Sequence, residues 1–297
     1  MNICGKEIHV KGRLVRIARL DGEKYTFTDD PQSMVDQLKR FGKRVDILTF
    51  LQRFPETSPK YNYPMEWDNL AVLPISTFDH WWTQQIKSFP RNRARQAEKK
   101  GVVLREIPCD ETLFRGICQI YNETPIRQGR RFPYYGMSVD GARDYACTFL
   151  DRSIYVGAFL GDTMIGFIKL VISEGRTHAC LVHILSMLQH KDKAPTNALI
   201  AYAVRACADR NIPYLVYENF TYGNKTGDSL SHFKEVNGFR RMDIPRYYVP
   251  LTPWGQIVFR LGLHHRLVDR IPESVAGRLR EFRKTWYHRR TQSVTEA

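Results

Sequence analysis

The order of apolar and polar positions along the chain predicts a mixed α+β fold. Three consecutive, largely apolar segments have the length of strands, and Gly161-Asp162 between the first two is a typical hairpin turn. The elements expected from there onward are strands at 153–160, 164–173 and 176–187, a helix at 195–210, a strand at 214–219, a helix at 228–237 and a strand that ends at Val249. This order is typical of one mixed sheet with helices on its faces.

The first 75 residues predict a smaller α/β unit. Its helix begins at Pro31, and Met34, Val35 and Leu38 recur at helical spacing before Gly42. Further elements expected outside the central segment are strands at 10–19, 24–28, 44–50, 70–75 and 102–107, and helices at 77–89, 91–100, 111–121, 139–150, 253–267 and 273–287. We therefore divide the chain into an N-terminal subdomain (1–75), a main domain (76–250) and a basic helical extension (251–297).

Composition narrows the class of protein. The chain of 297 residues is 43% hydrophobic, which is ordinary for a globular core, and its net charge is +14. No apolar run is long enough to span a bilayer or to form a secretory signal, so we expect a cytoplasmic protein. A basic surface attracts anions such as phosphate, nucleic acid, acidic carrier proteins or acidic lipid. The six cysteines are scattered, without paired Cys/His spacing, so we expect no metal site and no disulfide framework.

Several motifs resemble the acetyltransferase (GNAT) superfamily. The segment Leu215-Val-Tyr-Glu-Asn-Phe, followed by Phe233-Lys-Glu-Val-Asn-Gly-Phe239, resembles the strand and helix that close the GNAT core. The stretch Arg93-Ala-Arg-Gln-Ala-Glu-Lys-Lys-Gly-Val102 and the motif Tyr121-Asn-Glu-Thr with Arg127-Gln-Gly129 are similar to the FemAB-type branch. The resemblance covers about residues 78–248. It implies a GNAT-like central mixed sheet, with residues 1–75 as a reduced copy of the first half of a tandem GNAT pair.

The expected donor site departs from the GNAT pattern. GNAT enzymes that use coenzyme A hold its pyrophosphate with R/Q-x-x-G-x-G/A at a helix N-terminus. The matching stretch here, Gln189-His-Lys-Asp-Lys-Ala-Pro-Thr-Asn-Ala198, has no glycine, although lysine side chains there can compensate with charge. The donor therefore stays open among acyl-CoA, acyl-carrier protein and aminoacyl-tRNA. The residues expected to contact it are Ser186, His190, Lys191, Lys193, Thr196 and Asn197.

Four residues are candidates for the chemistry of acyl transfer. The resemblance gives the pair Phe233-Lys234 a role in catalysis, with the lysine as a fixed cation for the oxyanion or leaving group; the alternative is a solvated helix lysine. His183 is a candidate base, or else a hydrogen-bonded core histidine. Glu218 is a candidate base acting through water, or else the partner of an arginine.

The aromatic and basic loop at 127–136 is the expected acceptor site. Arginines grip carboxylate or phosphate and tyrosines stack on sugars or rings, which suits an anionic or glycan-like acceptor; the alternative is a loop ordered for structural reasons. The candidate acceptor residues are Arg127, Arg130, Arg131, Tyr134, Tyr135, Asn219 and Tyr222.

The function expected from these features is acyl transfer. An acetyl or aminoacyl group would move from a thioester or tRNA ester to an amine or hydroxyl of a small molecule, glycan or cell-envelope precursor. The basic, amphipathic C-terminal segment either contacts anionic membrane at its inner face or packs on the core. A second hypothesis is an inactive GNAT-fold module that binds RNA or anionic membrane.

Overall fold

The computed structural model describes residues 1–41, 44–127, 129–222 and 229–265. The strands are β1 (Asn2–Ile3), β2 (Lys6–Lys11), β3 (Ile17–Leu20), β4 (Ile47–Leu51), β5 (Met65–Pro74), β6 (Val102–Glu106), β7 (Ile126–Arg127), β8 (Arg130–Arg131), β9 (Ser153–Leu160), β10 (Thr163–Ile172), β11 (Ala179–Ser186), β12 (Tyr214–Val216) and β13 (Arg240–Pro250). The α-helices are α1 (Pro31–Arg40), α2 (Phe78–His80), α3 (Ser88–Lys99), α4 (Glu111–Tyr121), α5 (Val139–Ala146), α6 (Pro195–Asp209), α7 (Ser229–Val236) and α8 (Pro253–Arg260).

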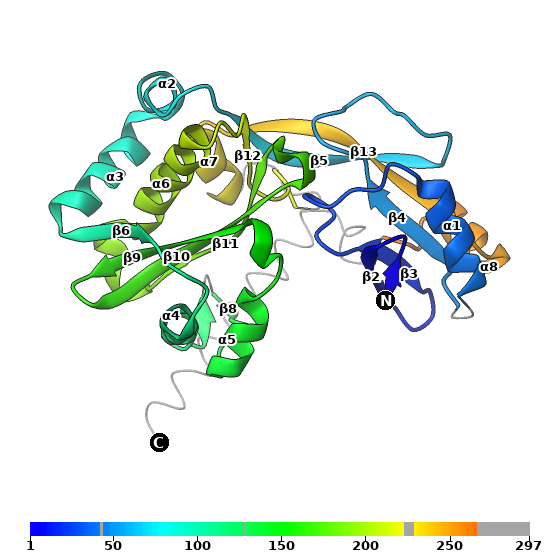
Figure 1. The fold of residues 1–297 in the computed structure, drawn as a ribbon, viewed down its shortest axis with the longest axis horizontal. Helices are drawn as coiled ribbons and strands as arrows, with labels where there is room; N and C mark the ends of the chain where they lie inside the picture. The colour runs from blue at the N-terminus through cyan, green and yellow to red at the C-terminus, as the bar shows by residue number, and fades with distance from the viewer. Residues whose placement is uncertain (42–43, 128, 223–228, 266–297) are drawn as a thin grey trace.

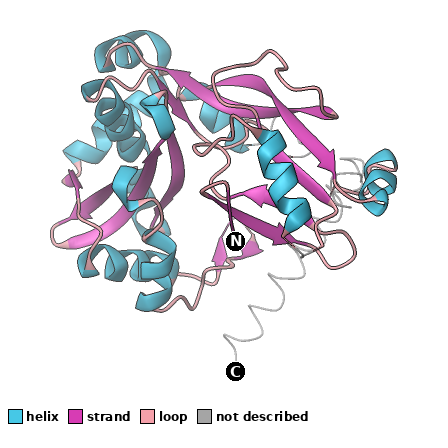
Figure 2. Cartoon of the chain, turned by 45° about the vertical axis from the view of Figure 1, so that its right-hand side comes forward, coloured by secondary structure: helices cyan, strands magenta, loops and turns pink. Residues whose placement is uncertain are grey.

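One sheet runs through the whole molecule. Its strand order is β1-β2-β3-β4-β13-β5-β12-β11-β10-β9-β6, and β7 and β8 form a separate hairpin. Helices α3 and α6 cover one face of β9–β11 and helices α4 and α5 the other, while α1 and α8 flank the N-terminal strands (Figure 1). Figure 2 shows that the strands run through the middle of the structure and that the helices lie outside them. The prediction of a mixed α+β fold with flanking helices is confirmed.

Strand β13 joins the two halves of the sheet. Its first eight residues, Arg240–Tyr247, pair antiparallel with β5, and its last five, Arg246–Pro250, pair with β4. A large apolar core packs around β9–β11 and α6, and a smaller one packs β2–β4 under α1. A third cluster joins the halves, because Phe27, Leu51 and Phe54 pack with Cys180 of β11 and Val216 of β12. The halves therefore share both a hydrogen-bonded ladder and this central apolar contact.

Most predicted elements of the main domain are present, and the differences have local causes. Helix α4 and strand β9 have the predicted bounds. The strand expected at 10–19 is instead two strands, because the backbone turns at Gly12, where φ is +106° and a Cβ would lie 1.9 Å from the carbonyl oxygen of Val15. Residues 24–28 are not a strand. The helix expected at 273–287 lies outside the described residues.

His178 holds the segment after β3 against the main domain. The ring is fully buried, with Nε2 2.7 Å from the carbonyl oxygen of Lys24 and Nδ1 3.0 Å from Oγ1 of Thr177. Because the carbonyl can only accept, Nε2 carries the proton and Nδ1 accepts from the hydroxyl. Burial lowers the pKa of His178 to about 4, so the ring is neutral in the folded protein at neutral pH.

We predict that this histidine makes the fold acid-sensitive. In the unfolded chain the ring binds a proton near pH 6.5, whereas in the folded chain it does so near pH 4. The free energy of unfolding should therefore be fully retained above pH 6.5 and fall by roughly 3 kcal/mol as the pH drops to 4. Denaturant titrations at each pH should show a smaller fall for His178→Asn than for the wild type. The exposed His80→Asn is the control, and equal slopes for His178→Asn and the wild type would contradict the prediction.

Candidate active site

Strands β11 and β12 separate in the middle of the sheet. They run parallel, and among the described residues they pair only at Ala179↔Leu215 and Cys180↔Val216. After Val216 the segment that follows β12 remains hydrogen-bonded to β5. The N–H of Tyr217 donates to the carbonyl of Ala71 at 2.8 Å, and the N–H of Ala71 donates to the carbonyl of Glu218 at 2.9 Å. The rest of β11, up to Ser186, pairs with β10 and with no other strand in the described part of the chain. Its edge toward β12 therefore offers peptide groups to another partner.

A β-bulge lies on β11 at the same level. Lys169 of β10 is opposite His183, but the next residue, Leu170, is opposite Leu181, so Val182 is the extra residue. A bulge re-aims the side chains that follow it and increases local twist. Strand separation and bulge together turn the second half of β11 away from β12.

Lys234 of α7 lies at the end of β12. Its side chain is fully buried, and Nζ donates to the backbone carbonyl of Asn219 at 2.5 Å. The ammonium also lies 4.8 Å from the ring centroid of Tyr217 and 4.9 Å from that of Tyr222. Such ring contacts partly offset the cost of burying a cation. The alternative of a solvated helix lysine is therefore wrong, and the catalytic role stays a prediction.

Phe233, the other half of the predicted pair, has a packing role in the structure. Its side chain is partly buried against the large core, on the same helix as Lys234. Phe233 thus packs α7 on the large core, Lys234 ties it to Asn219, and a catalytic role for Phe233 stays a prediction.

Glu218 and Asn219 both bind Lys24 of the N-terminal half. Lys24 Nζ forms an ion pair with the Glu218 carboxylate and donates to Oδ1 of Asn219 at 2.7 Å. The Asn219 amide donates in turn to Oδ1 of Asp68 at 2.7 Å. Glu218, two residues after the end of β12, has φ +51°, a left-handed conformation that turns the chain there. The expected arginine partner of Glu218 is a lysine, and the Asn219 side chain is held by neighbouring side chains.

Arg246 completes this network on the far side of Asp68. Its guanidinium donates to Asp68 Oδ2 at 2.9 Å and to both carboxylate oxygens of Glu23 at 2.7 Å. Burial alone would raise the pKa of Glu23, but the paired guanidinium lowers it below its usual range. The Glu23 carboxylate is thus ionised, and the network ties β5, β12 and β13 to the segment after β3.

His183 is paired with Tyr145 of α5. The Tyr145 hydroxyl lies 2.8 Å from Nδ1 of His183, and the two rings stack with centroids 4.0 Å apart. Burial, with a contribution from nearby Lys169, lowers the pKa of His183 to about 3. The imidazole is therefore neutral at pH 7 but holds a proton poorly, which makes it a weak general base. This environment fits the alternative of a hydrogen-bonded core histidine.

Lys169 is a buried cation that the sequence analysis does not select. Its Nζ donates to the carbonyls of Ala146 and Thr148 at 2.8 and 2.6 Å and to the Thr148 hydroxyl at 2.6 Å. Burial lowers the pKa of Lys169 to about 8. The signal in the sequence is a lysine in the middle of an otherwise apolar strand. In the structure Lys169 holds the end of α5 against β10, and this also positions Tyr145 of α5.

Arg127 is part of an internal support for the segment after β11. The guanidinium donates to the carbonyls of Ser186 and Ile120 and to the carboxylate of Glu123, each at 2.8 Å. Glu123 in turn accepts from the backbone N–H groups of Leu188 and Gln189, also at 2.8 Å. Burial lowers the pKa of Arg127 below its usual value. Arg127 is thus occupied inside the protein, and an acceptor contact by it stays a prediction.

The remaining acceptor candidates are mostly exposed. Arg130 and Arg131 form β8 and point into solvent, and Tyr135 is 49% exposed. Tyr134 packs its ring against Tyr121, Phe132 and Tyr145. Tyr222 is 40% exposed, with its ring beside Lys234. Side chains that can meet a ligand therefore gather around Tyr134 and around Tyr222, not in one tight cluster.

The predicted donor residues surround the start of α6. Ser186 and Thr196 share a hydrogen bond between their hydroxyls at 2.8 Å. Pro195 has no N–H, and the N–H groups of Asn197 and Ala198 bond to the carbonyl of Ala194, which has φ +53°. The N-terminus of α6 thus offers few free amides to a phosphate.

Charges in the donor segment partly cancel. Lys191 is exposed, and Lys193 lies 3.5 Å from a carboxylate oxygen of Asp192. The same carboxylate pairs at 3.0 Å with Lys100, the residue after α3. Nδ1 of His190 is buried without a partner in the described part of the chain. The segment presents lysines beside an acid, and donor contacts of His190, Lys191, Lys193 and Asn197 stay predictions.

Solved structures with the same fold identify the architecture. FemX aligns over 86% of this chain and 86% of its own, at 11% identity and a TM-score of 0.55. L-PGS from Bacillus licheniformis aligns over 86% and 85%, at 12% identity and 0.55. The C-terminal domain of a putative lysylphosphatidylglycerol synthetase from Agrobacterium fabrum aligns over 85% and 83%, at 12% identity and 0.53. These likenesses confirm the GNAT-like fold of FemAB type.

No family model and no curated protein matches the sequence. Among the described residues, the helices are too short or too polar to cross a bilayer.

We predict that Glu123 keeps the segment after β11 ordered. Glu123→Ala removes the acceptor of two backbone amides and the partner of Arg127, so amide hydrogen exchange at Leu188 and Gln189 should accelerate roughly 10-fold or more. Exchange in β10 serves as the internal reference for global stability. Glu111→Ala, which removes an exposed carboxylate of α4, should leave the segment protected. Unchanged exchange at Leu188 and Gln189 in Glu123→Ala would refute this role.

Proposed function

We propose that this protein is an acyltransferase that moves an aminoacyl group from a tRNA ester to an amine or hydroxyl. The observation that carries the proposal is the separation of β11 from β12, with the buried Lys234 bound to the segment that follows β12. The unpaired backbone edge of β11 supplies N–H donors for a bound acyl carbonyl, and Lys234 supplies a fixed positive charge beside it. The likeness in fold to FemX and to proteins described as L-PGS or lysylphosphatidylglycerol synthetase supports the same class.

Donor preference follows from the charges around the start of α6. The Glu123 carboxylate occupies the amides of Leu188 and Gln189, and Asp192 stands where the GNAT pattern has its first glycine. A pyrophosphate placed there would meet these carboxylates at short range. A tRNA carries its many phosphates away from the reacting ester, and the net charge of +14 favours such a polyanion. We therefore favour aminoacyl-tRNA over acyl-CoA and acyl-carrier protein.

The proposed reaction is an aminolysis or transesterification. The acceptor nitrogen or oxygen attacks the ester carbonyl carbon, the oxyanion is stabilised by β11 amides and the Lys234 ammonium, and the ester C–O bond then breaks. The acceptor loses a proton and the departing ribose oxygen gains one. We assign the first proton transfer to Glu218 rather than to His183, because the Glu218 carboxylate is 38% exposed beside the parting strands, whereas the His183 ring is stacked on Tyr145 and bonded to its hydroxyl. The exposed Arg130, Arg131 and Tyr135 would bind an anionic acceptor.

Donor binding tests the first part of the proposal. Calorimetry with coenzyme A and acetyl-CoA should show no binding tighter than about 1 mM, whereas a charged tRNA should bind with an affinity that falls steeply with salt. Micromolar binding of coenzyme A would overturn the donor assignment, although not the acyltransferase class.

Substitution of Lys234 tests the chemistry. Lys234→Met keeps the volume of the buried side chain but removes the charge, so we expect kcat for aminoacyl transfer to fall at least about 100-fold. Thermal unfolding should show that the variant folds, and Lys39→Met on the exposed face of α1 should retain full activity. Transfer by Lys234→Met at the wild-type rate would remove Lys234 from the mechanism. No transfer by the wild type to any amine or hydroxyl acceptor, from any of the three donor classes, would refute the proposed function.

A further inference from the structure

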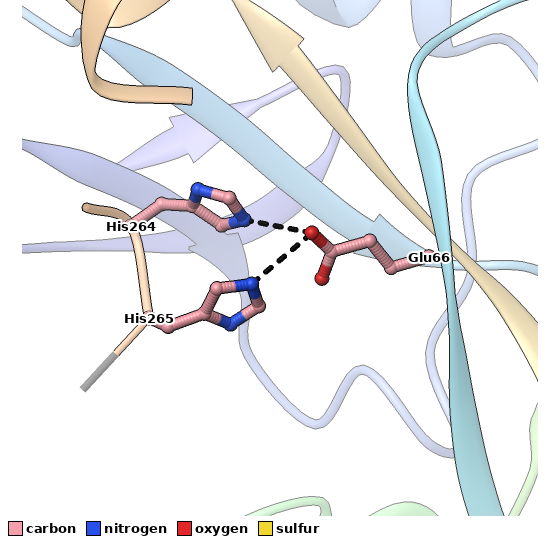
Figure 3. A group of neighbouring side chains, drawn as sticks. All are labelled: Glu66, His264 and His265. Atoms are coloured by element: carbon pink, nitrogen blue, oxygen red, sulfur yellow. Dashed lines mark hydrogen bonds and ion pairs between the residues drawn. The ribbon is translucent and has the colours of Figure 1, made fainter. Parts of the chain in front are cut away.

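Three side chains from distant parts of the chain converge on one point beside the N-terminal half of the sheet. Glu66 lies near the start of β5, and His264 and His265 follow helix α8 (Figure 3). Oε1 of Glu66 lies 3.0 Å from Nε2 of His264 and 3.1 Å from Nε2 of His265. All three of these atoms lie within 4.8 Å of one another. A carboxylate oxygen and two imidazole nitrogens thus face a common centre.

The packing around the cluster holds His264 in place. Its side chain is 2% exposed, stacks on Phe259 with ring centroids 4.8 Å apart, and meets the edge of Tyr248 at 4.6 Å. His265 and Glu66 are 39% and 36% exposed and leave one side open to solvent. The site is thus rigid on one side and accessible on the other, as an ion-binding site requires.

Two of the three spacings lie close to the edge length of a tetrahedral metal site, and the third is within 4.8 Å. Zinc binds imidazole nitrogen and carboxylate oxygen at roughly 2.0–2.2 Å, and a tetrahedron with such bonds has edges of about 3.3 Å. The two oxygen-to-nitrogen distances are a few tenths of an ångström shorter than that edge. Small side-chain rotations would therefore convert the hydrogen-bonded arrangement into a coordinating one.

We propose that Glu66, His264 and His265 bind one divalent transition-metal ion of the zinc class. Two imidazoles and one carboxylate are ligands that zinc shares with other borderline metals, whereas magnesium and calcium prefer oxygen alone. Each Nε2 gives its lone pair to the ion, and the proton of each ring then sits on Nδ1. Nδ1 of His264 is buried and has no hydrogen-bond partner among the described residues. Water takes the fourth position on the open side.

The ion cross-links β5 to the chain that follows α8. Glu66 lies near the start of β5, opposite Arg246 of β13. The residues of β5 that pair with β12 are Val72 to Pro74, at the other end of the strand. The metal site is therefore at the other end of β5 from the parting strands, and its role is structural. Glu66 is 198 and 199 positions away from the two histidines in the sequence. The prediction of no metal site rests on ligands at short spacing, and such a pattern does not detect this cluster.

Metal titration of the full chain tests the proposal. Protein stripped with EDTA should bind one Zn²⁺ per chain in calorimetry, and Co²⁺ should give the visible absorption of a tetrahedral site. Zn²⁺ should also raise the temperature of unfolding, because it binds the folded state. In Glu66→Gln and in His265→Asn the affinity should fall at least about 100-fold, more than for loss of an outer-shell partner. The matched control His80→Asn alters an exposed histidine on α2 and should bind as the wild type does.

Two results would overturn the site. One is the absence of zinc binding below millimolar concentration in the wild type. The other is binding of equal strength in His265→Asn, which would place the ion on other residues. His265 is partly exposed and its replacement leaves the core intact, so this variant gives a clear answer even if Glu66→Gln does not fold.

Discussion

The buried guanidinium of Arg246 is the interaction on which the geometry of the candidate site depends. It lies on the strand common to both halves of the sheet and binds Glu23 and Asp68, which come from different halves of the ladder. Removing one partner of such a buried set leaves an uncompensated charge, so the set acts as a unit. Asp68 orients the Asn219 amide, and the Asn219 carbonyl receives Lys234. The position of the candidate catalytic lysine therefore depends on an arginine of the shared strand β13.

Two buried lysines lie on either side of β11, and each donates to backbone carbonyls outside the strands. A buried ammonium needs acceptors, and Lys234 has one in the irregular backbone that follows β12. The acceptors of Lys169 instead lie at the end of helix α5, so this lysine of β10 holds α5 beside the bulge. In Lys169 the remaining cost is visible as a pKa lowered to about 8.

Local patterns in the sequence predict the fold well, and long-range polar contacts account for most of what they miss. Helix α4 and strand β9 follow from periodicity, because apolar spacing and caps are properties of neighbouring residues. The bulge at Val182 and the left-handed Glu218 break that periodicity without a marker residue such as glycine. Lys234 follows from its motif, but its burial does not, because the rings that cover it lie on other elements. The pairing of Glu123 with two amides is also invisible in the sequence, since it depends on the path of the chain after β11.

Net charge overstates the capacity of this surface to bind anions. Arg127 and Arg246 are both turned inward, where Arg127 is matched by a carboxylate and two carbonyls and Arg246 by two carboxylates. Arg152 likewise binds the backbone of Tyr25 and the hydroxyl of Thr26. An arginine held in this way contributes to the long-range field, but its guanidinium is bound inside the protein and does not reach a phosphate at the surface. A ligand that needs tight local grips, such as a pyrophosphate, gains little from these residues, whereas a long polyanion responds to the summed field. In a protein of this charge, long-range attraction of an anion and tight local binding of its phosphates therefore depend on different residues.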